Sequence, residues 1–301
     1  MRGRCGAPFH VLTFYKNLPQ IAAPLMRLAV VMTTYETPSA LDRVLGGYAL
    51  QSRRPEAVVV ADDGSGASTR QVVQAWAERR LFEVHHVWQE NAGYRRSRIL
   101  NLGIAAVQAD YVVLTDGDCL PHRNFVADHA QLAESGFWVQ GKRAQIRQAH
   151  ADQARPEDAE ALRLLRRGWL WRSVYGLRWP VPLVWRQTGA LRERALGSNM
   201  GLWREDLLAV NGFNEAFVGW GSEDRELSVR LHRLGRRKKF VIGRALQFHL
   251  DHPATSRART ADNGDLLADV RASGVVRCAQ GLSAHLGAST GAPASLLDSR
   301  A

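Results

Sequence analysis

Short apolar runs alternate with longer helical patterns over residues 28–118, and this alternation constrains the fold more than any other feature. Segments of strand length occupy 28–34, 57–62, 82–88 and 111–116, and helical patterns occupy 37–51, 69–80 and 97–109. Strands that alternate with helices form βαβ units, in which the strands are parallel and the helices cover both faces of the sheet. The sequence therefore predicts an α/β fold with a Rossmann-like, mainly parallel central sheet flanked by helices.

Polar side chains gather where three of these predicted strands end. The clusters are Thr-Thr-Tyr-Glu at 33–36, Asp-Asp-Gly-Ser at 62–65 and Asp-Gly-Asp at 116–118. Ligands of open parallel sheets bind beyond the carboxyl ends of the strands. The sequence therefore predicts a binding site at this edge of the sheet.

Asp116 and Asp118 directly follow a buried-looking apolar run, although two carboxylates this close repel each other. One interpretation is an ordinary Asp-Gly turn after a strand. The other is a site for Mg²⁺ or Mn²⁺, which prefer hard oxygen ligands, with a diphosphate as a further ligand. The spacing alone leaves both interpretations open.

Glu223 and Asp224 open a later helical pattern, where acidic residues also stabilise the helix dipole. They directly follow Gly-Trp-Gly-Ser, so Gly221 allows a tight turn and Trp220 offers an apolar wall for stacking. A carboxylate beside such a wall is a candidate general base.

His249 and His252 lie at and beyond the end of a predicted strand at 245–250. A histidine in such a place is commonly structural. The alternative is that an imidazole joins a carboxylate at one metal ion.

The chain of 301 residues carries a net charge of +11, which favours anionic partners such as phosphate, nucleic acid or acidic lipid headgroups. No apolar run approaches the roughly 18–20 residues of a membrane-spanning helix. The basic N-terminus has no clean signal-peptide core. Three scattered cysteines form no metal-binding spacing, and their small number indicates a reducing, cytoplasmic location.

Taken in order, the motifs resemble those of the family 2 glycosyltransferases of the GT-A fold. From Leu28 to Pro253 the order is Thr-X-Tyr, Asp-Asp-Gly-Ser, Asn-X-Gly, Asp-X-Asp-Cys-X-Pro, Gly-Trp-Gly-X-Glu-Asp and a downstream histidine. The Gly-Trp-Gly-X-Glu-Asp stretch resembles the C-terminal motif of the β1,4-galactosyltransferase and chondroitin-polymerase type enzymes. The resemblance implies a GT-A domain that transfers a sugar from a nucleotide-diphosphate donor, with a UDP-sugar expected.

The resemblance also implies a division of the chain. We expect an N-terminal extension at 1–26, a GT-A domain at 27–253 and a flexible tail at 254–301. Within the domain, we expect a nucleotide-sugar-binding half at 27–141, a helical Arg/Trp-rich insert at 142–196 and an acceptor-binding, catalytic part at 197–253.

Family roles carry over to individual positions of this chain. The resemblance assigns donor binding to the loops after the first strands, with Asp63 reading uracil and Asp116 facing the ribose. The full set expected at the nucleotide sugar is Thr33, Tyr35, Glu36, Asp62, Asp63, Asn91, Arg98, Asp116 and Asp118, with Arg95 and Arg96 as alternatives to Arg98.

The resemblance further implies an inverting, metal-assisted transfer. Asp118 and His249 are expected to hold Mn²⁺ or Mg²⁺, with His252 as a weaker candidate. Asp224 is expected to act as the base, and Glu223 to bind the acceptor together with Trp220 and Gly221. The expected acceptor is a glycan, a lipopolysaccharide or a lipid-linked sugar.

Arginines and tryptophans dominate residues 163–186, and three interpretations of this segment remain. It is an ordinary helical insert with buried tryptophans, an interfacial segment on anionic lipid, or a lip that grips an acidic acceptor through arginine. The second would place the enzyme on the inner face of the cytoplasmic membrane.

Other functions remain as alternatives. A nucleotidyltransferase would also bind nucleotides through metal-bound aspartates, but it would not require the Gly-Trp-Gly-X-Glu-Asp wall. A basic nucleic-acid-binding or membrane-surface protein would explain the net charge, but not the acidic clusters at successive strand ends, and no nucleic acid partner is expected. A dinucleotide-binding dehydrogenase is excluded because no Gly-X-Gly-X-X-Gly follows the first strand.

Overall fold

The computed structural model describes residues 26–171, 173–187, 189, 195–252 and 260–287. The expected N-terminal extension therefore lies outside the described residues, apart from Met26. The same holds for positions 172, 188 and 190–194 of the expected insert, for residue 253 at the end of the expected domain, and for residues 254–259 and 288–301 of the expected tail.

An eight-stranded sheet with the order β3-β2-β1-β4-β10-β6-β11-β9 forms the centre of the described structure. Its strands are β1 (Leu28–Thr34), β2 (Ala57–Asp62), β3 (Glu83–Trp88), β4 (Tyr111–Asp116), β6 (Phe137–Gln140), β9 (Leu183–Arg186), β10 (Asn199–Trp203) and β11 (Arg237–Ile242). The pairings make six of these strands run in one direction, and only β9 and β10 run against them. The prediction of a mainly parallel sheet is confirmed.

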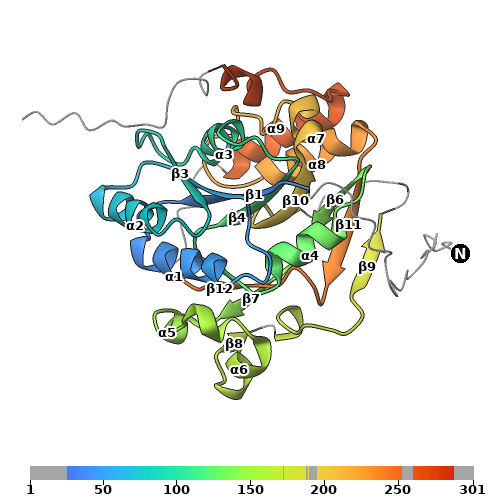
Figure 1. Cartoon of the computed structure of the whole chain (residues 1–301). Coiled ribbons are helices and arrows are strands. Elements are labelled where there is room, and N and C mark those ends of the chain that lie inside the picture. The colour runs from blue at the N-terminus through green and yellow to red at the C-terminus, as the bar shows by residue number, and fades with distance from the viewer. Residues whose placement is uncertain (1–25, 172, 188, 190–194, 253–259, 288–301) are drawn as a thin grey trace, which may run out of the picture.

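Helices cover both faces of this sheet (Figure 1), as strands that are apolar on both faces require. One face packs against α1 (Pro38–Ala49), α2 (Ala67–Glu78) and α4 (Phe125–Leu132), and the other against α3 (Arg96–Ala105), α7 (Arg204–Val210) and α8 (Glu223–Arg233). At Gly103 of α3, a Cβ atom would lie 2.8 Å from Val31 Cγ1, so only glycine allows this close approach to the sheet. Tight packing here holds α3 against β1 and β2.

A second, four-stranded sheet with the order β5-β12-β7-β8 lies below the first in Figure 1. Its strands are β5 (Cys119–Pro121), β7 (Arg143–Ile146), β8 (Leu170–Trp171) and β12 (Gln247–Leu250). It joins residues 119–121, which directly follow β4, to two strands of the expected insert and to β12 near the end of the expected domain. We call it the small sheet.

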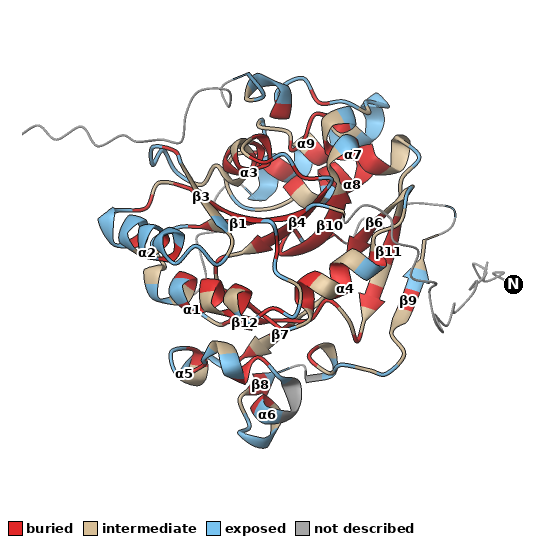
Figure 2. Ribbon diagram, viewed as in Figure 1, coloured by how far each residue is buried: buried red, intermediate tan, exposed pale blue. Residues whose placement is uncertain are grey.

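The described part of the expected helical insert contains short helices, and it also contains strands that the sequence did not predict. β7 pairs with β12, and β8 pairs with β7. The helical parts are short: α5 (Gln148–Ala151), α6 (Ala161–Arg166) and 3₁₀ turns at Pro156–Asp158 and Ser173–Tyr175. The burial of β7 alternates with a two-residue period, but four residues are too few to show this period in the sequence. Figure 2 shows that much of α5 and α6 is exposed.

The expectation of a flexible tail is also corrected for residues 260–287. Helix α9 (Thr260–Ser273) packs against α8 through Leu267, which is 2% exposed. The 3₁₀ turn Leu282–Ala284 contacts α3 and α7, and Leu282 is fully buried in the core between them. This segment therefore belongs to the folded domain.

Within the described residues, no helix is both long enough and apolar enough to cross a membrane.

Candidate functional site

The ends of β1 and β4 bring the first predicted site residues together. Thr33 pairs with Asp116 in the sheet, and its hydroxyl donates a hydrogen bond to Asp116 Oδ1 at 3.1 Å. Arg96, near the start of α3, lies 2.7 Å from the same carboxylate oxygen and also donates to the Thr33 hydroxyl. The Arg96 side chain is only 11% exposed, so the ion pair is strongly screened from water. The Asp116 carboxylate is therefore held in place by Thr33 and Arg96.

Asp62 and Asp63 follow β2 and have different partners. Asp62 is fully buried, accepts the Ser65 N–H at 2.8 Å and lies 2.9 Å from His86 Nε2. Burial opposes ionisation, but the hydrogen bonds from His86 and Ser65 outweigh it and lower the pKa of Asp62. Asp63 accepts the Arg95 N–H at 2.9 Å, and burial raises the pKa of its carboxyl. The two carboxylates thus shape the loop after β2 and present Asp63 towards the start of α3.

Tyr35, Glu36 and Asn91 form the rim above these aspartates. The Asn91 amide donates to the Tyr35 hydroxyl at 2.9 Å, and the Gly66 N–H donates to Glu36 Oε1 at 2.8 Å. Tyr35 is half exposed. The loops after β1, β2 and β3 therefore meet at one place, as the sequence predicted.

Asp118, His249 and His252 converge at the edge of the small sheet. His249 Nε2 lies 3.4 Å and His252 Nε2 3.0 Å from Asp118 Oδ2. Burial would raise the pKa of Asp118, but hydrogen bonds from the two imidazoles hold it well below its usual range. One ligand atom from each residue fits within 4.8 Å of the others, so the three can hold a metal ion. A carboxylate oxygen with imidazole nitrogens is a donor set that suits Mn²⁺.

Arg143 links this cluster to Asp116, and sequence reasoning missed it. Its guanidinium lies 3.2 Å from Asp116 Oδ2 and donates to Cys119 Sγ at 3.8 Å. Cys119 in turn donates to Asp118 Oδ1 at 3.3 Å. Arg143 lies in the insert, and only the parallel pairing of β7 with β12 brings it here, so no local motif could have identified it.

Glu223 and Asp224 lie at the start of α8 and share a buried, like-charged environment. The Gly197 N–H donates to Asp224 Oδ2 at 2.6 Å, and Arg96 Nε lies 3.5 Å from Glu223 Oε1. Burial and the charge of Asp224 raise the pKa of Glu223 to about 7, and burial also raises the pKa of Asp224. Glu223 Oε2 is buried and has no hydrogen-bond partner among the described residues.

The loop before α8 holds this pair in place. Gly219, Gly221 and Ser222 all have positive φ angles, of 85°, 101° and 75°. The Gly219 N–H donates to the Tyr94 carbonyl at 2.8 Å, which ties the loop to the segment before α3. Trp220 is 40% exposed. The left-handed turn at Gly221 and Ser222 therefore directs both acids inward and leaves the indole at the surface.

The three candidate arginines of the α3 segment have different positions. Arg96 lies between Asp116 and Glu223. Arg98 instead donates to Gln89 Oε1 at 2.6 Å, and Gln89 bonds to Asp63, so Arg98 is one step removed from the carboxylates. Arg95 contacts Asp63 through its backbone and the Glu90 carbonyl through its side chain. The structure thus places Arg96, rather than Arg98, at the centre of the charged cluster.

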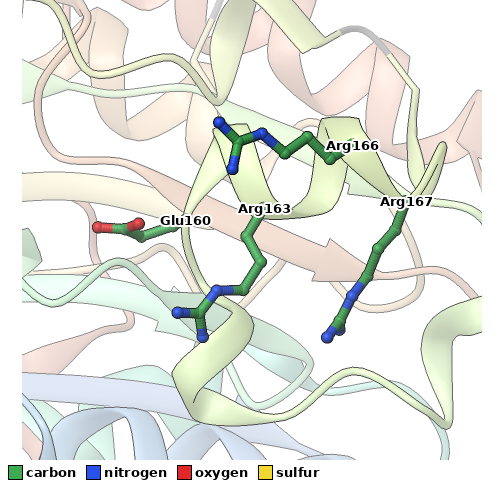
Figure 3. Close-up of a pocket in the computed structure, with 4 residues that line it drawn as sticks. All are labelled: Glu160, Arg163, Arg166 and Arg167. Carbon is green, nitrogen blue, oxygen red and sulfur yellow. The ribbon is translucent and has the colours of Figure 1, made fainter.

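A hollow of about 360 Å³ lies on the insert, and none of the residues that line it belongs to the charged cluster around Arg96. It is lined by Glu160, Arg163, Arg166 and Arg167 (Figure 3). Arg163 donates to the Glu157 carbonyl, and Arg167 pairs with Asp158 at 2.9 Å. Two of these arginines therefore already have partners within the insert.

Two family models match the chain. One, described as glycosyl transferase family 2, matches residues 29–181, which is just over half of the chain. The other, described as the N-terminal domain of galactosyltransferase, matches residues 191–252.

Several curated proteins are similar in sequence. Validoxylamine A glucosyltransferase of Streptomyces hygroscopicus subsp. limoneus is 30% identical over 240 residues, which span 72% of this chain and 50% of that protein. Hyaluronan synthase of Pasteurella multocida is 26% identical over 256 residues, which span 79% of this chain and 26% of that protein. Chondroitin synthase of Escherichia coli is 25% identical over 243 residues, which span 75% of this chain and 35% of that protein. The chain spans about half the length, or less, of these relatives.

Solved structures share the fold at low identity. S. aureus TarS 1–349 in complex with UDP has a TM-score of 0.55 at 15% identity, over 88% of this chain and 70% of that chain. The mannosyltransferase PcManGT from Pyrobaculum calidifontis, in complex with GDP-Man and Mn²⁺, has a TM-score of 0.52 at 19% identity, over 76% of this chain and 58% of that chain. The fold is therefore the GT-A fold.

Proposed function

The chain belongs to glycosyl transferase family 2, and from this premise we propose that it moves a sugar from a nucleoside diphosphate to an acceptor hydroxyl, with inversion. The observation that carries the proposal is that side-chain contacts connect the acidic cluster at Asp118 to the acidic pair Glu223 and Asp224. Asp118 lies with His249 and His252, and Asp116 connects this group through Arg96 to Glu223 beside Asp224. Such a site holds a leaving group at one end and a base at the other.

The donor is proposed to be a UDP-sugar that lies across the ends of β1, β2 and β4. Asp63 is proposed to read the uracil and Asp116 the ribose, with Thr33, Tyr35 and Asn91 along the same edge. A UDP complex of a protein with this fold supports the choice of nucleotide.

Asp118 and His249, with His252 as a third ligand, are proposed to hold Mn²⁺ or Mg²⁺. The donor set fits, because a carboxylate held ionised lies within 3.4 Å of two imidazole nitrogens. When bound, the ion would stabilise the negative charge that develops on the departing diphosphate. A Mn²⁺ complex of a protein with this fold supports the assignment.

Asp224 is proposed to be the general base. The Gly197 N–H holds one of its oxygens at 2.6 Å, which leaves the other to accept the proton of the attacking hydroxyl. Burial raises the pKa of Asp224 and makes the carboxylate a better base at neutral pH. Glu223, whose Oε2 has no hydrogen-bond partner among the described residues, is proposed to orient the acceptor beside Trp220 and Gly221.

The acceptor is proposed to be a glycan or a lipid-linked sugar. The names of the relatives, which include hyaluronan and chondroitin synthases, support a saccharide acceptor. Peripheral contact with an anionic membrane on its cytoplasmic side is proposed through the exposed arginines of the insert, such as Arg163 and Arg166. Sedimentation with liposomes, with and without anionic lipid, tests that contact.

The test of the function is a panel of UDP- and GDP-sugars, incubated with Mn²⁺ and scored for the product released. We expect one or few UDP-sugars to yield UDP and a glycoside or free sugar. Conversion of the nucleotide sugar and added pyrophosphate into a nucleoside triphosphate and a sugar 1-phosphate, without release of the nucleoside diphosphate, would identify a nucleotidyltransferase and overturn the proposal.

A further inference from the structure

One face of the small sheet packs into a hydrophobic cluster, and the other, here called the open face, is exposed only towards β8: Cys119 and His249 on it are buried, whereas Trp171 is 60% exposed. Ala144, Ile146, Leu170, Phe248 and Leu250 pack into a single hydrophobic cluster on the buried face. Side chains alternate along each strand, so the neighbours of these residues lie on the other face. That open face therefore carries the residues in between, which include His249 of the metal cluster.

A single row of paired residues crosses the open face. The pairings join Cys119 to His249, His249 to Gln145, and Gln145 to Trp171. Residues paired in this way point to the same side of a sheet. Gln145 Nε2 lies 3.3 Å from His249 Nδ1, which confirms that these two side chains share that side. Since strands are about 4.8 Å apart, the backbone of Trp171 lies about 10 Å from that of His249.

Trp171 ends this row as the most exposed large hydrophobic side chain among the described residues, at 60%. Its neighbour Leu170 is buried on the opposite face, so the exposure of the indole follows from the strand and not from a loose loop. A large apolar side chain at the edge of a site is a feature of ligand-binding surfaces.

Arg147 lies beside Trp171 and keeps its charge available. It follows β7 on the same face as Gln145, and its guanidinium carbon is 5.9 Å from the centre of a Trp171 ring. Within 26–171, 173–187, 189, 195–252 and 260–287, no carboxylate pairs with it. An exposed indole with a guanidinium over its ring, and no carboxylate paired with that guanidinium among the described residues, presents stacking and anion recognition together.

We propose that Trp171 and Arg147 form an acceptor subsite that binds a sugar ring bearing an anionic group. The C–H groups on one face of the ring stack on the indole, and a carboxylate, sulfate or phosphate on the ring pairs with the guanidinium. This inference rests on the proposed function, because it assigns the ring to the acceptor of a glycosyl transfer.

The position of the subsite favours the acceptor over the donor. The nucleoside end of the donor is assigned to the loops after β1 and β2, which lie beyond β4 from the small sheet. Asp224 lies beside the Arg96 that pairs with Asp116, so the transferred sugar is held on that side of the cluster. Trp171 lies at the opposite end, two strands beyond His249, so the unit that it binds is a remote unit of an acceptor long enough to reach Asp224 as well.

The experiment is a calorimetric titration with a hexasaccharide of alternating glucuronate and N-acetylglucosamine, in the presence of UDP and Mn²⁺. The same hexasaccharide with its carboxylates methyl-esterified is the neutral counterpart. We expect the acidic form to bind the unchanged protein about tenfold more tightly than the ester. Trp171→Ala should weaken both forms about tenfold, and Arg147→Gln should remove the preference for the acid.

Trp185→Ala is the matched control, because Trp185 is 37% exposed on β9 of the large sheet, and it should leave both affinities unchanged. Two results would overturn the subsite: neither hexasaccharide binds the unchanged protein, or Trp171→Ala binds both as well as the unchanged protein does. The affinity for UDP with Mn²⁺ is measured for the unchanged protein and for every variant. In the variants it shows whether the protein is folded, and in the unchanged protein it tests the proposed function. If the unchanged protein does not bind UDP with Mn²⁺, the proposed function is contradicted. If every variant binds UDP and Trp171→Ala leaves the affinity for both hexasaccharides unchanged, only the subsite is contradicted.

Discussion

Asp224 and Glu223 are adjacent in the chain, yet their carboxylates have different surroundings. One oxygen of Asp224 accepts the Gly197 N–H, whereas Glu223 faces Arg96 with one oxygen and has no hydrogen-bond partner in the described chain for the other. Both carboxyls have raised pKa values because both are buried. Two neighbouring acids with different partners can take different roles, one accepting a proton and one binding a hydroxyl.

Asp224→Asn should abolish transfer and leave donor binding nearly intact. The amide keeps the shape and the contact with Gly197 but cannot accept the acceptor proton, so kcat should fall by about 10²–10⁴-fold. Steady-state kinetics and a UDP titration of the same preparation measure the two quantities. Lost donor affinity with preserved turnover would contradict the assignment.

Glu223→Gln should stabilise the donor-free protein at alkaline pH. The folded-state pKa of Glu223 is about 7, above its ordinary 4.5, so the folded state binds more protons between these values and stability falls as pH rises through this window. The difference corresponds to at most about 3 kcal/mol. We expect the variant to gain about 1–3 kcal/mol in free energy of unfolding at pH 8, and nothing at pH 4.5, in urea titrations.

The matched control is Glu56→Gln at an exposed position, which should change stability by less than about 0.5 kcal/mol at either pH. A gain for Glu223→Gln that is the same at pH 4.5 and pH 8 would show that ionisation of Glu223 is not its cause.

The sequence predicted residues that belong to short motifs, and it missed those that only pairing of distant strands brings in. Asp118 with His249, and Asp116 near the loops after β1 and β2, converge as expected. Arg143 could not be predicted, because nothing in its local sequence indicates that it faces Asp116. The sequence also left open which of Arg95, Arg96 and Arg98 lies nearest the carboxylates, because the direction of each side chain depends on where α3 begins.

At the scale of elements, the C-terminal segment shows how composition can mislead. Residues 260–287 are rich in small and charged residues, yet α9 and the turn after it place a few apolar side chains in the core. Because the periodic apolar signal is weak, only the tertiary contacts of Leu267 and Leu282 reveal that the segment is folded. The strands of the insert were missed for a similar reason, since β7 and β8 are too short for a clear alternation.

Leu282→Ala should destabilise the protein by about 2–5 kcal/mol, because it opens a cavity among fully buried side chains. Leu286→Ala, four residues later and 37% exposed, should cost less than about 0.5 kcal/mol. Thermal and urea unfolding of the two variants make the comparison. Equal effects would mean that the segment does not pack on the core as described.

On the scale of the whole molecule, one chain of polar contacts spans both sheets and two helices. It joins the proposed metal cluster of Asp118, His249 and His252 to the proposed catalytic pair, Glu223 and Asp224, without passing through the apolar core. Its members, in order, are His249, Asp118, Cys119, Arg143, Asp116, Arg96 and Glu223. The long parallel sheet was predictable from the alternation of strands and helices, but the small sheet that completes the site was not, because its strands come from distant parts of the chain.

The most direct test is a titration of UDP into the protein with Mn²⁺ and after exhaustive chelation, repeated for Asp118→Asn. We expect Mn²⁺ to raise the affinity for UDP at least tenfold in the unchanged protein and to have no effect in the variant, because the remaining histidines lack the anionic ligand. UDP that binds equally well after chelation, or an Asp118→Asn protein that keeps the full effect of Mn²⁺, would contradict a metal-held donor at this site.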